Sequence, residues 1–264
     1  MLKQRIQTAI AALIVVAAAL FLMPIWATRL IIAALMILAA WEWSGLLSAA
    51  EPPAIRTLYV GLIVMLTAAV SWLVPEPLST ELFFAFAVGW WMLAFIWLLF
   101  HPTPIPTAIA WICGALVIVP AWFSLDWLYL RNGLSLLVLL LIVVGADTGA
   151  YFSGKLFGRV KLAPRISPGK TWEGAIGGIA VVSLLAAIFA WQTGGDLAVY
   201  LPLWIAVAII SIVGDLTVSV FKRRAGVKDS GRLFPGHGGV LDRIDSISAA
   251  TPVFALAMAA GAMA

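Results

Sequence analysis

The residues best suited to chemistry in this chain lie close together, between Ser219 and Asp245. The stretch reads S-V-F-K-R-R-A-G-V-K-D-S-G-R-L-F-P-G-H-G-G-V-L-D-R-I-D and combines carboxylates with six cations, one histidine and five glycines. Carboxylate and hydroxyl oxygens are the ligands that Mg²⁺ prefers, cations neutralise phosphates, and glycine lets the backbone approach a ligand closely. The composition of this stretch is therefore typical of a site for a divalent metal and a polyphosphate.

Three candidate groups share one face of a single helix. Asp215, Ser219 and Lys222 are spaced at i, i+4 and i+7, which places them on the same side of a helix. A solvated run of charge, the usual alternative, explains Lys222 and its basic neighbours. It does not explain Asp215, which lies about two turns inside an apolar segment, so we expect this carboxylate to have a partner or a function.

Two more aspartates follow a glycine-rich loop. Asp242 and Asp245 are spaced at i and i+3 and share a face if this segment is helical. The loop before them contains P-G-H-G-G, whose glycines allow close approach to a ligand. His237 lies between these glycines, and both a structural and a functional role stay open for it.

A further carboxylate, Asp147, interrupts an apolar run in the segment D-T-G-A-Y. A charge at that depth costs about 2.5–3.5 kcal/mol on insertion scales. Asp147 therefore either belongs to a site or pairs with a cation in a close helix contact made by Gly145, Gly149 and Gly154.

The segment I-S-P-G-K-T-W-E-G, residues 166–174, supplies another candidate patch. Ser167 lies at a turn, and Lys170 is a compact cation suited to a phosphate. Glu173 and Gly174 begin an apolar run whose helical N-terminus would present free N–H groups to an anion. A plain loop with helix-capping residues is the alternative.

These groups suit phosphoryl-type transfer, in which positioning and charge neutralisation supply most of the catalysis. The chain has one cysteine, Cys113, which lies in an apolar run, and only two histidines. A disulfide and a cysteine–histidine zinc site are therefore excluded.

The composition indicates the elements that must position these residues. Of the 264 residues, 64% are hydrophobic and 11% charged, whereas soluble domains are about 45–50% apolar and 25% charged. We predict an all-α, polytopic integral membrane protein, because only helices satisfy their own backbone in lipid outside closed barrels. About nine apolar runs are long enough to span a bilayer: residues 6–23, 30–48, 57–74, 82–100, 107–125, 133–151, 174–191, 199–221 and 244–264.

The distribution of cations predicts the orientation. With a cytoplasmic N-terminus, all Lys and Arg except Arg29 and Arg131 fall inside, which is 14 of 16, as the positive-inside rule requires. The polar loops 152–173 and 222–243 then face the cytoplasm, as does the active site, in a bacterial-type inner membrane. Nucleic-acid binding is disfavoured, because the cations flank spans. The start of the chain reads as a span rather than a signal peptide.

We expect two regions of different roles. Residues 1–140 form supporting transmembrane helices with short loops, for lipid or dimer contacts. Residues 141–264 contain seven of the 12 acidic residues and 11 of the 16 cations, so the catalytic region should lie there.

At this point a family resemblance is visible. The pattern S-x-x-K-R-x-x-x-x-K-D…P-G-H-G-G-x-x-D-R-x-D begins here at Ser219 and ends at Asp245. Together with S-P-x-K-T-W-E-G from Ser167 and the segment at Asp147, it resembles the hallmark of phosphatidate cytidylyltransferases (CDP-diacylglycerol synthases). The resemblance covers about residues 145–245, whereas residues 1–140 are similar only in being apolar and multi-spanning.

The resemblance implies an enzyme that transfers a cytidylyl group from CTP to phosphatidate in the bilayer, giving CDP-diacylglycerol and pyrophosphate. It implies Mg²⁺, with K⁺ as a second cation, and a homodimer. The family's metal site maps onto Asp215, Ser219, Asp242 and Asp245, and its phosphate-binding lysines onto Lys170 and Lys222. We expect catalysis by Asp215, Lys222, Asp242 and Asp245, and substrate contacts from Asp147, Ser167, Lys170, Ser219, Arg223, Lys228, His237 and Arg243.

Two other classes compete with this interpretation. A transporter of an anionic metabolite could use Asp147 and Asp215 in its pathway, but the internal repeats that would favour it are not visible. A CDP-alcohol phosphotransferase also uses membrane-edge aspartates, but with a D-G-x-x-A-R…D-x-x-x-D pattern, and this chain has D-R-I-D. A purely structural scaffold does not explain aspartates beside basic loops.

Overall fold

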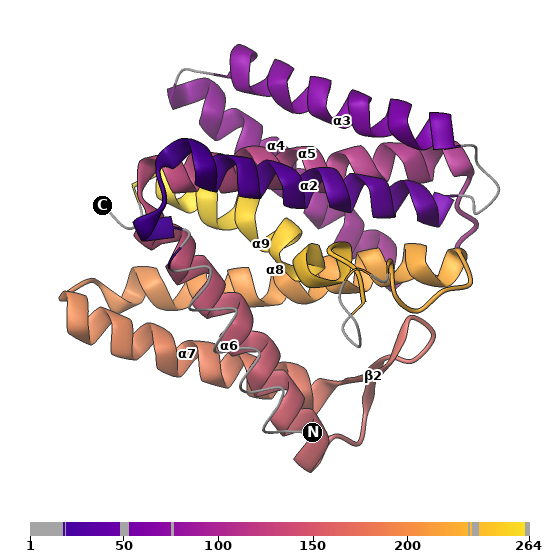
Figure 1. The fold of residues 1–264 in the computed structure, drawn as a ribbon. Helices are drawn as coiled ribbons and strands as arrows, with labels where there is room; N and C mark the ends of the chain where they lie inside the picture. The colour runs from indigo at the N-terminus through magenta and orange to yellow at the C-terminus, as the bar shows by residue number, and fades with distance from the viewer. Residues whose placement is uncertain are drawn as a thin grey trace.

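The fold is a bundle of long helices with one small hairpin at one end (Figure 1). The computed structural model describes residues 18, 20–47, 53–74, 77–231, 233 and 238–261. Over these residues the elements are α2 (Ile25–Leu47), α3 (Pro53–Leu73), α4 (Pro77–Leu99), α5 (Thr107–Arg131), α6 (Gly133–Phe157), β1 (Lys161–Ala163), β2 (Ser167–Thr171), α7 (Trp172–Thr193), α8 (Leu197–Arg224) and α9 (Leu241–Ala259).

The helices α2 to α8 are each long and apolar enough to cross a membrane. Their outward side chains are largely hydrocarbon: Leu58 and Met65 on α3, for example, are 73% and 70% exposed, as a lipid-facing surface requires. The prediction of an all-α, polytopic membrane protein is confirmed. The predicted count of nine spans is not confirmed. The described residues contain seven helices that are long and apolar enough to span, and the first predicted span lies mostly outside the described residues.

The helix α9, which covers most of the last predicted span, lies in the interior of the bundle. It lies in the middle of the bundle in Figure 1 and contacts α8, α4, α5 and α2. Buried residues occur all round it, including Ser246, Ser248 and Thr251. Ser248 and Thr251 donate to backbone carbonyls one turn earlier. Because its surface is covered by protein, α9 can carry polar residues that lipid would not tolerate.

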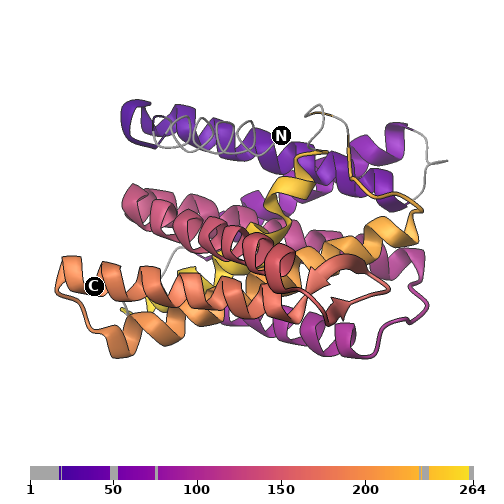
Figure 2. The same cartoon turned by 90° about the horizontal axis from the view of Figure 1, so that it is seen from below.

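The two polar segments of the second half meet at the same end of the molecule. The hairpin and the segment that follows α8 lie on the same side in Figures 1 and 2. The predicted loop 152–173 is shorter than expected, because α6 continues to Phe157 and β1 pairs with β2 through Lys161–Thr171 and Ala163–Ser167. The last turns of α6 stay helical where Gly154 packs closely against the start of α7.

The hairpin is attached to the start of α7 by two side chains. Thr171 caps the helix, with its Oγ1 accepting from the N–H of Gly174 at 3.1 Å. Glu173 accepts from the N–H of Val160 at 3.1 Å. The predicted helix start near Glu173 is therefore confirmed, and these bonds orient the strand that carries Lys170.

Glycines let α6 and α7 approach closely, as the sequence indicated. A Cβ atom on Gly149 would lie 2.8 Å from a methyl of Val181, and one on Gly178 would lie 2.6 Å from the carbonyl oxygen of Ala146. Both distances are too short for real contacts. The helices can therefore lie this close together only because glycine has no side chain at these positions.

We expect Gly178→Ala to lower the free energy of unfolding by about 1–3 kcal/mol, because the added methyl would push against backbone that cannot yield locally. Gly89→Ala on α4 is the matched control, since a Cβ there meets nothing within 4 Å. Thermal unfolding of both variants in detergent measures the difference. Equal melting temperatures for the two would contradict the close contact.

Candidate active site

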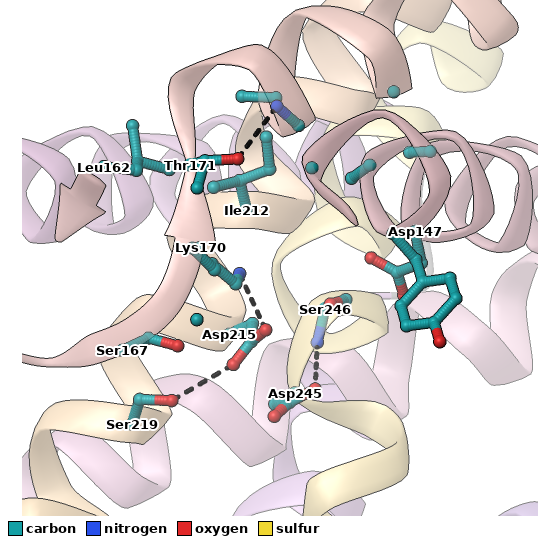
Figure 3. A pocket seen from close by; sticks show the side chains of 18 of the residues that line it. Asp147, Leu162, Ser167, Lys170, Thr171, Ile212, Asp215, Ser219, Asp245 and Ser246 are labelled. Carbon is teal, nitrogen blue, oxygen red and sulfur yellow. Dashed lines mark hydrogen bonds and ion pairs between the residues drawn. The ribbon is translucent and has the colours of Figure 1, made fainter. Parts of the chain in front are cut away.

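A cavity of about 570 Å³ opens between α6, α7, α8, α9 and the hairpin. Figure 3 shows Asp147, Asp215 and Asp245 around it, from α6, α8 and α9, with Lys170 reaching in from β2. Its charged lining residues are Asp147, Lys155, Lys170, Asp215, Lys222, Arg223, Lys228, Asp229, Asp242 and Asp245. The second half of the chain thus brings both signs of charge into one cavity.

The innermost cation of the cavity is Lys222, near the end of α8. Its Nζ donates to Asp242 Oδ1 at 2.8 Å and to Asp245 Oδ2 at 3.5 Å. All three side chains are less than a tenth exposed, at 9%, 8% and 9%. A buried ammonium is tolerated only beside opposite charge, so this triad joins α8 firmly to α9.

A second ion pair lies nearer the cavity mouth. Lys170 Nζ is 2.7 Å from Asp215 Oδ2, with each side chain 26% exposed, and Ser219 donates to Asp215 Oδ1 at 3.1 Å. Asp215, Ser219 and Lys222 therefore share one helical face, as their spacing predicted. The ion pair brings the hairpin to this face of α8 (Figure 3).

Asp242 is the most fully bonded carboxylate of the site. Besides Lys222, its Oδ2 accepts from the N–H groups of Ser230 and Gly239, both at 2.8 Å. Burial alone would raise the pKa of Asp242, but the Lys222 ammonium and these N–H groups outweigh it and lower this pKa below its usual range. Gly238 adopts a φ of 80°, a conformation that favours glycine, and so turns the chain around the carboxylate.

Other predicted site residues have different surroundings. Ser167 and Lys228 line the cavity. Arg223 also lines it, but its Nε donates to the carbonyl of Ile166 at 3.1 Å, so its guanidinium also fastens the hairpin to α8. Arg243 is on the first turn of α9 and is not among the lining residues, and His237 lies outside the described residues. The roles predicted for all of these stay predictions.

The predicted metal ligands offer the right chemistry, since carboxylate and hydroxyl oxygens suit a hard divalent cation. Within the described part of the chain, however, no group of three or more acidic, histidine or cysteine side chains is placed to bind a metal ion. The ammonium groups of Lys170 and Lys222 contact the carboxylates instead. The assignment of a metal to Asp215, Ser219, Asp242 and Asp245 stays a prediction.

Two residues at this end of the molecule were not among the predicted site residues. Asp229 lines the cavity, and Glu42 of α2 contacts the start of α9. The sequence carried a signal for Glu42, because an ionisable side chain within an apolar run is a candidate for function by default. Glu42 was not included among the predicted site residues because it lies in the first 140 residues, for which the sequence predicted a supporting role.

Comparison with known proteins places the chain in a family. The sequence profile of the cytidylyltransferase family matches residues 3–260. The protein named phosphatidate cytidylyltransferase from Pseudomonas aeruginosa is 44% identical, with 99% of this chain and 98% of the relative covered. Its namesake from Haemophilus influenzae is 39% identical, with 96% and 97% covered. One from Brucella suis is 47% identical over 47% of each chain.

Because the family match spans nearly the whole chain, this protein belongs to the cytidylyltransferase family. It is therefore an enzyme of the nucleotidyltransferase class, embedded in a membrane by its apolar helices. The resemblance indicated by the motifs between Asp147 and Asp245 is confirmed.

We expect Lys222→Met to lower the free energy of unfolding by about 3–5 kcal/mol, because it leaves two buried carboxylates without their counter-ion. The double variant Lys222→Met/Asp245→Asn should regain part of this loss. Lys161→Met, at an exposed position of β1, is the control. Thermal unfolding in detergent gives the comparison, and a Lys222→Met protein as stable as the control would refute the buried triad.

Proposed function

We propose that this protein is a phosphatidate cytidylyltransferase, which converts CTP and phosphatidate to CDP-diacylglycerol and pyrophosphate. The observation that carries the proposal is the single cavity in which Asp215, Asp242, Asp245, Lys170 and Lys222 gather. The full-length relatives from Pseudomonas aeruginosa and Haemophilus influenzae bear this name, which supplies the substrate class.

The cations of the cavity would bind the triphosphate of CTP. Lys170 is partly exposed and forms an ion pair with Asp215, so it can exchange a carboxylate for a phosphate without unfolding the hairpin. Lys222 is buried deeper and would contact a phosphate only from within the triad. Point charges of this kind neutralise a polyphosphate as negative charge shifts to the leaving group.

The lipid substrate suits a cavity between membrane helices. Its phosphate is anchored at the bilayer surface, and the cavity is bounded by the apolar helices α6, α7 and α8. In the proposed reaction a phosphatidate oxygen attacks the α-phosphorus of CTP in line. The new O–P bond forms as the bond between the α-phosphorus and the bridging oxygen breaks, and pyrophosphate leaves with that electron pair. The attacking oxygen is already an anion, so no strong general base is needed.

Asp215, Ser219, Asp242 and Asp245 are the residues that would hold Mg²⁺. Such an ion would supply charge neutralisation at the phosphates. Lys170 and Lys222 would also neutralise phosphate charge, since they contact the same carboxylates and carry positive charge into the cavity. The additional monovalent cation and the homodimer belong to the proposal on the family resemblance alone.

The proposed location is the bacterial inner membrane, with the cavity facing the cytoplasm. CTP is a cytosolic nucleotide, and the hairpin and the segment after α8 lie at the same end of the bundle (Figure 2). That end carries most of the chain's cations, which supports a cytoplasmic assignment.

The decisive experiment incubates purified protein in mixed micelles with labelled CTP and phosphatidate in the presence of Mg²⁺. We expect a lipid-soluble, cytidine-labelled product and equimolar pyrophosphate. Asp215→Asn should reduce the rate at least about 100-fold, whereas Glu81→Gln on α4 should retain it. An Asp215→Asn protein with full activity would remove Asp215 from the site, and a wild-type protein that makes no such product would refute the proposed function.

Removal of metal tests the cation requirement separately. Activity should vanish in excess EDTA and return when Mg²⁺ is added beyond the chelator, because carboxylates and phosphates together then bind the ion. Intrinsic tryptophan fluorescence should show that the fold persists in EDTA. Turnover that continues in EDTA would contradict the metal assignment and leave the substrate assignment intact.

A further inference from the structure

A carboxylate from the first half of the chain reaches the start of α9. Glu42 of α2 accepts three hydrogen bonds: Oε1 from the N–H of Val240 at 2.9 Å, and Oε2 from the N–H of Leu241 at 2.9 Å and from the hydroxyl of Ser230 at 2.7 Å. The two partner segments follow Glu42 by nearly 190 and 200 positions, with separations of 188, 198 and 199. A residue of α2 thus binds the segment between α8 and α9 at Ser230 and again at the junction with α9.

This contact supplies the cap that α9 lacks locally. The N-cap residue of α9, Val240, makes no side-chain capping bond. The first N–H groups of a helix have no partner within the helix, and their positive end favours a negative charge. Glu42 satisfies two such donors at the N-terminal end of α9 with a carboxylate, so it fixes where α9 begins.

Ser230 connects this cap directly to the cavity. Its hydroxyl donates to Glu42 and its backbone N–H donates to Asp242. Asp242 in turn accepts from Gly239 and contacts Lys222. A single residue, Ser230, therefore links Glu42 to Asp242, the carboxylate that pairs with the buried Lys222. All of these hydrogen bonds have ordinary lengths.

Two glycines make room for the carboxylate. A Cβ atom on Gly231 or on Gly239 would collide with the carboxylate of Glu42. A side chain at either position would have to displace this carboxylate and break its hydrogen bonds, so the two glycines and Glu42 fit one another closely. This accounts for the last glycine of the P-G-H-G-G motif without a ligand.

We propose that Glu42 is a positioning residue for the reaction: it sets the place of Asp242 and Lys222 in the cavity by fixing the N-terminal end of α9 and the backbone at Ser230. The proposal rests on the proposed function for its kinetic part. It also makes α2 a part of the catalytic unit, whereas the sequence had assigned the first 140 residues a supporting role.

The test compares Glu42→Ala, Glu42→Gln and Ser230→Ala with Glu81→Ala, a carboxylate deletion on α4 that touches none of these groups. For Glu42→Ala we expect kcat/KM for CTP to fall about 10- to 100-fold, as for partners that orient ligating residues, with a raised KM for CTP. Glu42→Gln keeps the shape, but its NH2 group replaces one acceptor oxygen and faces a donor, so it should show a loss between that of Glu42→Ala and the wild type. Ser230→Ala removes one of three bonds and should show a smaller effect.

The KM for CTP separates positioning from a merely structural role. A smaller folded fraction lowers the maximal rate but leaves this KM unchanged. Hydrogen exchange of the peptide covering residues 238–245 gives a second readout, and we expect its amides to exchange at least about 10-fold faster in Glu42→Ala, because two donors lose their acceptor.

The experiments test the role of Glu42 separately from the proposed reaction. A Glu42→Ala protein with an unchanged KM for CTP and unchanged exchange of residues 238–245 would overturn the proposal. If wild-type protein makes no CDP-diacylglycerol, the proposed function fails, and the exchange experiment still decides whether Glu42 fixes α9. Should Glu42→Ala not fold, Glu42→Gln and Ser230→Ala carry the same comparison, and wild-type kinetics and exchange in both would refute the role.

Discussion

The ammonium group of Lys222 is buried beneath the polar end of the bundle, and the surrounding structure depends on its neutralisation. Removing it from water is costly, and the cost is offset only because Asp242 and Asp245 meet it from another helix. This requirement determines how α8 and α9 pack against each other at the cavity. It also explains why α9 lies inside the bundle, since a helix that begins with these aspartates could not face lipid.

The same rule governs the other polar groups at this end. Asp215 meets Lys170 and Ser219, Arg223 meets a carbonyl of the hairpin, and the carboxylate of Glu42 meets the unpaired N–H groups of α9. In an interior of low dielectric, an unpaired polar group raises the free energy of the folded state. Each of these charged groups is therefore stable only with its partner element packed beside it. The hairpin, α2 and α9 are positioned by these pairings as much as by apolar packing.

This arrangement suits a nucleotidyltransferase whose acceptor is a membrane lipid. Apolar helices bound the cavity on one side, and the small polar hairpin bounds it at the end together with Lys228 and Asp229 after α8. Charge neutralisation rather than a strong base is what such a transfer needs, and paired lysines and aspartates provide groups of both signs. The close, glycine-mediated contact of α6 with α7 supports the wall that carries Asp147.

The sequence alone determined the membrane class, the helical content, the family and most of the cavity's charged residues, because apolar run length and the spacing of Asp215, Ser219 and Lys222 are local properties. It did not show that α9 is enclosed by other helices, since hydropathy says nothing about a helix's neighbours. It also placed Glu42 in a supporting region, because a contact across about 200 residues leaves no local pattern. Which carboxylate meets which lysine, and which helix end needs a distant cap, were decided only when tertiary packing enclosed those groups away from water.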